Sequence, residues 1–272
     1  MCYYVYACIL IYQREEVTLK DPKAMAFCNA YGVLAALENL CEMDDEAKKI
    51  CQKLKAPVAF CFDVKDGPCF TLSFTNDGCK FLEGDAECTC KMSFTSPDAF
   101  NNLIDNSKPG IPTKNPVQVL TFLLGPFTKL TNILVKYLRA SDEDLKNKDF
   151  FEKSTILTMY VIGGAICALG NNDEISKLSA SYIVDGDVQM GITDKVYVTV
   201  KARNHVLTLE KKKPENPRAI MEFNSIELAN GLFNGTASTM GELCAGNIYM
   251  SGMINMLDNI NRILDRVSIY LA

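Results

Sequence analysis

The residues of this chain that could do chemistry are few in type, and their spacing limits the reactions available to them. His205 is the single histidine among 272 residues, so a multi-histidine metal site cannot form. It follows Arg203-Asn204 between two segments of β-type pattern, which is typical of a solvated hairpin turn. A nucleophilic triad would need partners in a fixed geometry, and no spacing in the sequence indicates them. We therefore expect no catalytic residues and no cofactor.

Cysteine is abundant: twelve occur, ten of them within the first 90 residues, and no two form a C-x-x-C pair. Cys88 and Cys90 are predicted to lie on one face of a strand together with Met92 and Phe94. Because that face is otherwise apolar, filling of the core is favoured over a metal site. The uneven distribution does not resemble a secreted disulfide framework. We expect free thiols, no metal, and a reducing cytoplasmic location.

Two further motifs have simple structural interpretations. Gly163-Gly164-Ala165 lacks the spacing of a phosphate-binding loop and lies in an apolar helical stretch, which favours close helix packing. The run Lys211-Lys212-Lys213 is predicted to be a solvated loop, with a contact to membrane headgroups as the alternative.

Composition excludes several classes of protein. Lys plus Arg number 28 against 33 for Asp plus Glu, which argues against nucleic-acid binding because that calls for a clustered basic face. We find no run of about 20 apolar residues and so expect no transmembrane helix. The apolar residues 1–12 lack the features of a secretory signal. They are predicted to add an edge strand, with a membrane-surface anchor as the alternative.

The C-terminal segment 219–272 has the clearest pattern of secondary structure. It predicts a short strand, a helix capped at Asn224-Ser225, a second short strand, and a long amphipathic helix. The apolar stripe of that last helix comprises Met253, Met256, Leu257, Ile260, Ile263, Leu264, Val267 and Leu271.

This order resembles the C-terminal half of the sterol carrier protein (lipid-transfer domain) family. Ala245-Gly246-Asn247-Ile248 and Ser251-Gly252 occupy the glycine positions of that family, with Asn247 in place of its usual lysine. The resemblance implies a terminal helix that covers an apolar tunnel. It also implies non-catalytic binding or carriage of a lipid, sterol or other apolar small molecule, with transient contact to a membrane surface.

The hydrophobic pattern of the first half recurs in the second half. Val188, Met190 and Ile192 repeat Phe60, Phe62 and Val64 at an offset of 128, and an extra residue enters before Met221 and Phe223, which repeat Met92 and Phe94. We predict an α+β fold with two tandem sterol-carrier-like domains, each a mostly antiparallel sheet of about five strands with helices packed over it. The predicted divisions are an apolar extension at 1–20, a first domain at 21–140, a hinge at 141–149 and a second domain at 150–272.

The first copy departs from the family pattern. Its proline-containing segment 105–116 is predicted to be an exposed loop, and residues 121–125 stand where the family has a glycine-flanked strand. Bulky Phe122, Phe127 and Tyr137 lie near the equivalent of the tunnel, so we expect the larger cavity in the C-terminal copy.

The predicted ligand-binding residues are the apolar side chains beneath the terminal helix of each copy: Phe223, Leu232, Phe233, Met250, Met253, Met256, Leu257 and Ile260 in the second, and Leu103, Phe127 and Leu130 in the first. On this basis Met256→Trp should weaken the binding of an apolar probe. The alternative function is an interaction, scaffold or enzyme-accessory module whose pockets are filled.

Overall fold

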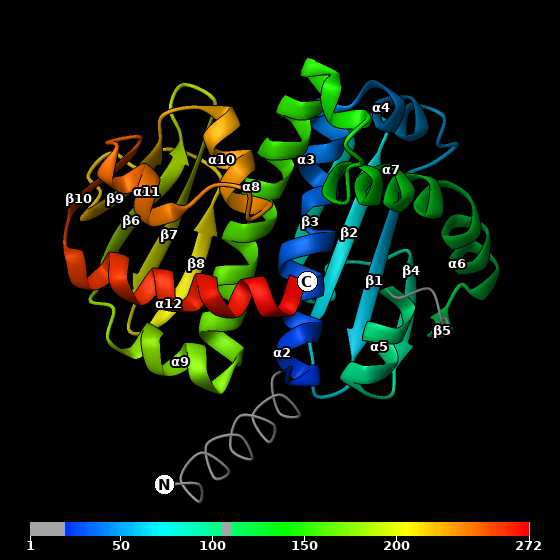
Figure 1. Cartoon of the computed structure of the whole chain (residues 1–272). Coiled ribbons are helices and arrows are strands. Elements are labelled where there is room, and N and C mark those ends of the chain that lie inside the picture. The colour runs from blue at the N-terminus through cyan, green and yellow to red at the C-terminus, as the bar shows by residue number, and fades with distance from the viewer. Residues whose placement is uncertain (1–19, 105–109, 272) are drawn as a thin grey trace, which may run out of the picture.

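The computed structural model describes residues 20–104 and 110–271. Two five-stranded sheets lie on either side of a layer formed by long helices (Figure 1), and further helices cover each sheet. The predicted α+β class with two sheets is confirmed. The strand or anchor expected at residues 1–12 falls outside the described residues.

The first sheet and its helices come from the N-terminal half of the chain. The helices, with the π-helical segments η1 and η2, are α2 (Pro22–Phe27), η1 (Cys28–Leu34), α3 (Ala36–Met43), α4 (Asp45–Gln52), α5 (Pro97–Ile104), α6 (Pro116–Phe122), η2 (Leu123–Phe127) and α7 (Thr128–Leu138). The strands are β1 (Val58–Val64), β2 (Cys69–Thr75), β3 (Gly78–Glu83), β4 (Cys90–Phe94) and β5 (Ile111–Lys114).

The second sheet and its helices follow a short 3₁₀ turn, η3 (Asp144–Lys146). The helices are α8 (Lys148–Asn172), α9 (Glu174–Ser181), α10 (Ile226–Phe233), α11 (Thr239–Cys244) and α12 (Ile254–Leu271). The strands are β6 (Gly186–Ile192), β7 (Val196–Arg203), β8 (Val206–Glu210), β9 (Ala219–Phe223) and β10 (Ile248–Gly252).

The two sheets share one topology. The strand orders are β3-β2-β1-β4-β5 and β8-β7-β6-β9-β10. The central strand of each sheet runs parallel to one neighbour, β1 to β4 and β6 to β9, and all other neighbouring strands are antiparallel. The pairing of Phe60 with Leu72 recurs as Val188 with Val200, an offset of 128. The residues that pair with Phe60 and Val188 on the parallel side are offset by 129. The predicted repeat, including its one extra residue, is confirmed.

The outermost strand of the first sheet corrects one expectation. Residues 111–114, predicted to be loop, form β5 on the antiparallel edge of β4, with a register shift next to Met92. Pro112 can occupy this strand because an edge strand needs hydrogen bonds on one side only. Residues 121–125, which stand where the sterol carrier family has a glycine-flanked strand, are helical and belong to α6 and η2.

Polar side chains cap the starts of several helices, and the predicted cap at Ser225 is one of them. Asp44 accepts a hydrogen bond from the backbone N–H of Ala47 at 2.8 Å and begins α4. Asp173 does the same for α9 through the N–H of Ser176 at 3.0 Å. Ser225 begins α10 and accepts from the N–H of Leu228. These side chains satisfy backbone donors that would otherwise lack a partner.

The first core is dominated by phenylalanine. The rings of Phe62 and Phe70 stack with centroids 4.9 Å apart, and Phe60 lies 4.6 Å from Phe62. Phe122 and Phe127, from α6 and η2, join this group beside Phe60. The second core is aliphatic by comparison, with valine, isoleucine and methionine at the equivalent strand positions.

The long helices α2–η1–α3 and α8 meet at glycines. A Cβ atom on Gly164 would lie 2.2 Å from the carbonyl oxygen of Tyr31, and one on Gly32 would lie 3.2 Å from that of Val161. The backbones can approach this closely only because neither residue has a side chain. The predicted close packing at Gly163-Gly164 is confirmed.

Within residues 20–104 and 110–271, three helical segments are long and apolar enough to cross a membrane by length and composition: Pro22–Met43, Pro116–Leu138 and Lys148–Asn172. This corrects the expectation that no segment would qualify. The first and third are 72% buried within the fold, so most of their apolar side chains are used in the two cores. Only 33% of Pro116–Leu138 is buried, which leaves apolar side chains such as Val117 and Leu124 exposed.

Candidate functional site

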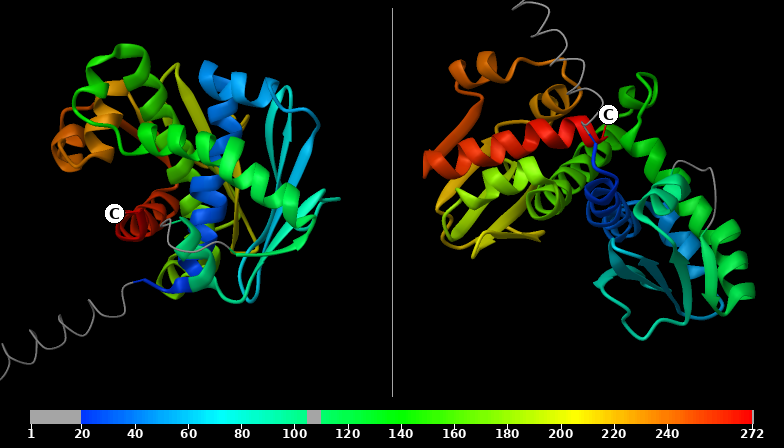
Figure 2. Two further views of the ribbon diagram at one scale, coloured as in Figure 1. Left: turned by 90° about the vertical axis from the view of Figure 1, so that its right-hand side faces the viewer. Right: turned by 90° about the horizontal axis from the view of Figure 1, so that it is seen from below.

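A cavity of about 1450 Å³ lies where the two units meet. Elements α2, η1, α7 and α8 form one side of it, and β9, α10, β10 and α12 form the other. Helix α12, red in Figure 1 and Figure 2, lies across one face of the second sheet and runs toward the first unit, where the chain ends. The apolar lining side chains include Met25, Val33, Val135, Leu138, Met159, Val161, Ile162, Met190, Met221, Phe223, Leu232, Phe233, Ile248, Met250, Leu264, Val267 and Leu271.

Four of the predicted ligand-binding residues line this cavity: Phe223, Leu232, Phe233 and Met250. Strand pairing places β10 against β9, and the rings of Phe223 and Phe233 meet edge to face at 6.0 Å. Because side chains alternate between the two faces of β9 and β10, residues of these strands join those of α10 in one wall of the cavity.

The other predicted residues lie elsewhere. Met256, Leu257 and Ile260 are buried in the second core, and Met253 packs against that core. In the first copy, Phe127 and Leu130 are buried in the phenylalanine core and Leu103 packs against it.

The reason lies in the position of α12. Its N-terminal half packs down on its own sheet, whereas side chains nearer its C-terminus, such as Leu264 and Leu271, face the junction between the units. Met256→Trp would therefore overfill a packed core instead of blocking the cavity.

The contribution of the first copy was missed by sequence reasoning. Met25, Val33, Val135, Leu138 and Leu145 line the cavity although they belong to the other unit or to the connecting segment. The sequence signal that could have indicated this contribution is the apolar character of α8. This helix is apolar around most of its circumference, and a helix of that kind must be covered on several sides.

Polar groups around the cavity mostly have partners within the protein. Asn29 donates to Asn101 Oδ1 at 3.1 Å, and Ser154 Oγ donates to the carbonyl oxygen of Tyr137 at 2.7 Å. Asn230 donates to Thr155 Oγ1 at 2.9 Å. The lining that the structure describes contains neither cysteine nor histidine. Its titratable side chains are Lys20, Arg139, Asp265 and two tyrosines, and apolar side chains make up most of the remaining lining.

The lysine run is more structured than a solvated loop. Lys211 Nζ lies 3.1 Å from Glu38 Oε2 and also donates to the carbonyl oxygen of Ala35, so it joins the two units. Lys213 lies over the ring of Tyr197, 4.4 Å from its centroid. The expectation of a purely solvated run is therefore wrong for Lys211. His205 lies, as predicted, in the exposed β7–β8 turn, with a positive φ of 65°.

No protein-family model and no curated protein matches this sequence. Among solved structures, a crystal structure of sterol carrier protein 2 is similar at 14% identity, over 40% of this chain and 92% of that chain, with a TM-score of 0.32. The apo form of sterol carrier protein 2 from Yarrowia lipolytica is similar at 15% identity, over 38% of this chain and 92% of that one, with a TM-score of 0.29.

An enzyme is similar as well. The stereoselective inverting sec-alkylsulfatase Pisa1 from Pseudomonas sp. is 11% identical over 53% of this chain and 29% of its own length, with a TM-score of 0.28. These similarities concern the fold alone.

Proposed function

We propose that this protein binds a lipid-like apolar small molecule, without changing it chemically, in the cavity between its two units. The observation that carries the proposal is the cavity itself. Its volume of about 1450 Å³ exceeds the roughly 300–1,000 Å³ of common ligand pockets, and apolar side chains from both units dominate its walls.

The expected affinity follows from burial of the ligand's hydrocarbon. Each buried methylene contributes about 0.8 kcal/mol, so about ten of them give roughly 8 kcal/mol before the costs of ordering. A dissociation constant in the micromolar range is the natural scale for such binding. Flexible methionine side chains, including Met221 and Met250, allow the walls to adapt to ligands of different shape.

The two copies contribute unequally. The interior of the first sheet is filled by Phe60, Phe62, Phe122 and Phe127, which leaves its helices to supply walls from outside. The second copy presents residues of β9, α10 and β10 directly to the cavity. This asymmetry supports a ligand held mainly by the C-terminal copy.

Binding can be tested with a fluorescent fatty acid and a fluorescent sterol. Leu232→Trp and Leu264→Trp each place a large ring in the cavity, and each should weaken probe binding by about tenfold or more. Leu120→Trp is the matched control, because Leu120 is exposed on α6 and does not line the cavity. Equal probe affinity in all three folded variants would contradict the proposal.

Native mass spectrometry of the purified full chain separates carriage from catalysis. A co-purifying apolar molecule recovered with unchanged mass after incubation supports simple binding. Conversion of the added molecule would show an enzyme. Failure of every probe and absence of any retained molecule would favour the alternative of an interaction module with filled pockets.

A further inference from the structure

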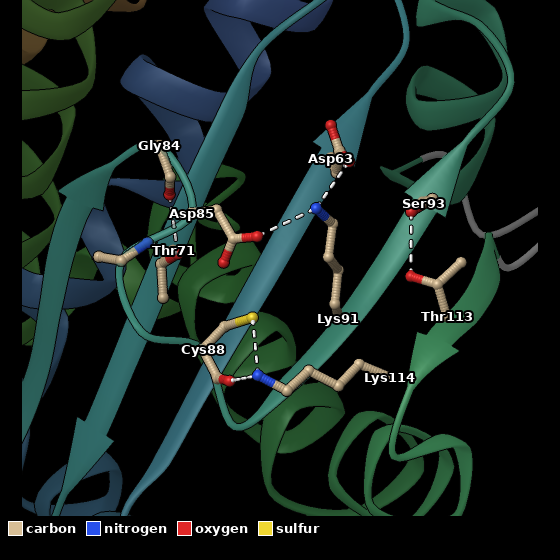
Figure 3. A network of polar contacts seen from close by, with 10 residues as sticks. Asp63, Thr71, Gly84, Asp85, Cys88, Lys91, Ser93, Thr113 and Lys114 are labelled. Carbon is tan, nitrogen blue, oxygen red and sulfur yellow. Dashed lines mark hydrogen bonds and ion pairs between the residues drawn. The ribbon is translucent and has the colours of Figure 1, made fainter.

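A cluster of reactive side chains, Cys61, Asp85 and Cys88, lies on the outer face of the first sheet, away from the phenylalanine core; Figure 3 shows Asp85 and Cys88 on this face. The sulfur atoms of Cys61 and Cys88 and a carboxylate oxygen of Asp85 all lie within 4.8 Å of one another. Cys61 is on β1, and the other two residues belong to the loop between β3 and β4. Both thiols are buried, with 0% and 4% of the residues exposed, whereas Asp85 is open to solvent.

This placement corrects the sequence prediction for the C-x-C pair. Cys90 lies on β4 and fills the phenylalanine core, but Cys88 precedes the strand, and its sulfur meets Cys61 instead. The preceding Glu87 has a positive φ of 37°, so the chain turns before the strand begins. Strand alternation therefore does not extend back to Cys88.

The loop that carries Asp85 and Cys88 is fixed at both ends. Thr71 Oγ1 donates to the carbonyl oxygen of Gly84 at 2.8 Å and accepts from the N–H of Ala86 at 3.2 Å. Lys114 Nζ donates to the carbonyl oxygen of Cys88 and lies 3.8 Å from its sulfur. Thr71 and Lys114 thus fix the loop so that Asp85 and Cys88 lie beside Cys61.

The second copy shows that the fold does not require these donors. Thr199 is the equivalent of Thr71, and its Oγ1 donates in the same way to the carbonyl oxygen of Lys212 at 2.7 Å. The position of Cys61, however, is occupied by Gln189 at the offset of 128. The loop attachment is common to both copies, and the thiol and carboxylate donors are specific to the first.

We propose that Cys61, Cys88 and Asp85 bind a thiophilic divalent cation of the Zn²⁺ class, with Cys69 or a water molecule as the fourth ligand. Two thiolates and a carboxylate are ligands that Zn²⁺ accepts in tetrahedral sites. Cys69 lies on the same outer face, at the position of β2 opposite Asp63. Sulfur atoms around tetrahedral Zn²⁺ are about 3.8 Å apart, so the two sulfur atoms need to close by at most roughly 1 Å.

The surrounding charges match such an ion. With water as the fourth ligand, the two thiolates with Asp85 and Asp63 carry four negative charges once both thiols have released their protons to solvent. Lys91 lies 2.8 Å from Asp63 and 3.1 Å from Asp85, and with Lys114 and a divalent ion it supplies four positive charges. The exposed carboxylate of Asp85 gives the ion a path from solvent to the buried sulfur atoms.

Cobalt titration of the reduced, chelator-treated full chain tests the site, because thiolate ligation gives a charge-transfer band in the near ultraviolet. We expect one Co²⁺ per chain with this band, displaced by Zn²⁺. Cys61→Ser/Cys88→Ser should abolish the band, and Asp85→Asn should weaken binding by at least about tenfold. Cys244→Ser, at an exposed cysteine of α11, is the matched control and should bind like the parent chain.

Circular dichroism establishes that each variant is folded. If the double serine variant does not fold, X-ray absorption of the zinc-loaded parent chain replaces it, and two or three sulfur ligands are the expected first shell. The proposal is overturned if the parent chain shows no thiolate band, if the band persists in the folded double variant, or if the zinc shell contains no sulfur.

Discussion

The hydroxyl of Tyr270 donates to Asp173 Oδ1 at 2.9 Å, and the same contact occurs in the first copy between Tyr137 and Asp44 at 2.9 Å. In each copy a tyrosine of the last helix reaches the aspartate that caps the start of α4 or α9. Tyr270 also accepts a hydrogen bond from the backbone N–H of Asp21 at 2.9 Å, which ties the C-terminal helix to the start of the first unit. The repeat thus extends to one specific polar contact.

Removing that hydroxyl should destabilise the protein. In Tyr270→Phe the buried carboxylate of Asp173 and the N–H of Asp21 both lose a partner, and a hydrogen bond to a charged group contributes about 1.5–3 kcal/mol. Chemical denaturation should show a loss of this order. Tyr182→Phe removes an exposed hydroxyl and should change little. Equal stability of the two variants would contradict the role given to Tyr270.

The stability of the protein should fall in acid through Asp173. Burial opposes ionisation of this carboxyl, but hydrogen bonds from Arg266, Ser176 and Tyr270 outweigh it and hold its pKa below the ordinary value. The contribution is therefore fully present above the unfolded-state pKa of about 3.9 and is lost as the pH falls through the lower folded-state pKa. The free energy of unfolding should decrease less steeply below pH 6 in Asp173→Asn than in the parent chain. An identical dependence on pH in the two proteins would argue against this assignment.

The crossing of the long helices should not tolerate a methyl group. Gly164→Ala would place Cβ 2.2 Å from a backbone carbonyl oxygen, so the helices must separate and both cores must shift. Gly125→Ala is the matched control, because a Cβ there meets nothing within 4 Å. Thermal unfolding should show a marked loss of stability for the first variant and little change for the second. The interpretation fails if the two melt alike.

Truncation of the phenylalanine core should affect stability more than ligand binding. Phe127→Ala removes a buried ring that packs on Phe60 and Phe62, at a cost of about 3–5 kcal/mol. Phe127 does not line the cavity, so probe affinity measured well below the melting temperature should stay within about twofold of the parent value. A large loss of binding in the folded variant would place the ligand in the first copy.

All twelve cysteines should be free in protein prepared from a reducing cytoplasm. The ten that the structure describes are free thiols, and Cys51 Sγ donates a hydrogen bond to Cys41 Sγ at 3.6 Å without a disulfide between them. Thiol titration under denaturing, non-reducing conditions with a chelator present should therefore count twelve. A count of ten or fewer would show that a disulfide forms.

Much of the fold could be predicted because the strands are regular. The alternation of Phe60, Phe62 and Val64 and its return at an offset of 128 specified the facing residues of both sheets. The short edge strand β5 could not be recognised, because its Ile111-Pro112 sequence is that of a loop and pairing with β4 alone makes it a strand.

The site was harder to predict than the fold. Apolar periodicity shows that a residue such as Met256 is buried but does not distinguish a packed core from a cavity wall. The lining contributed by Met25 and Ile162 depends on how the two units meet, and that arrangement is set by the glycine crossing between distant segments. The cluster of Cys61 with Cys88 depends on a loop that folds back over the sheet, which no local pattern encodes.

The long helices affect how the protein can fold during its synthesis. Leu157 and Val161 of α8 belong to the phenylalanine core of the first unit, and Ala24 and Cys28 of the first helical segment belong to the core of the second. The N-terminal unit therefore cannot complete its interior until the ribosome has released the chain well beyond residue 161. The emerging first half therefore keeps part of its apolar surface uncovered until α8 arrives.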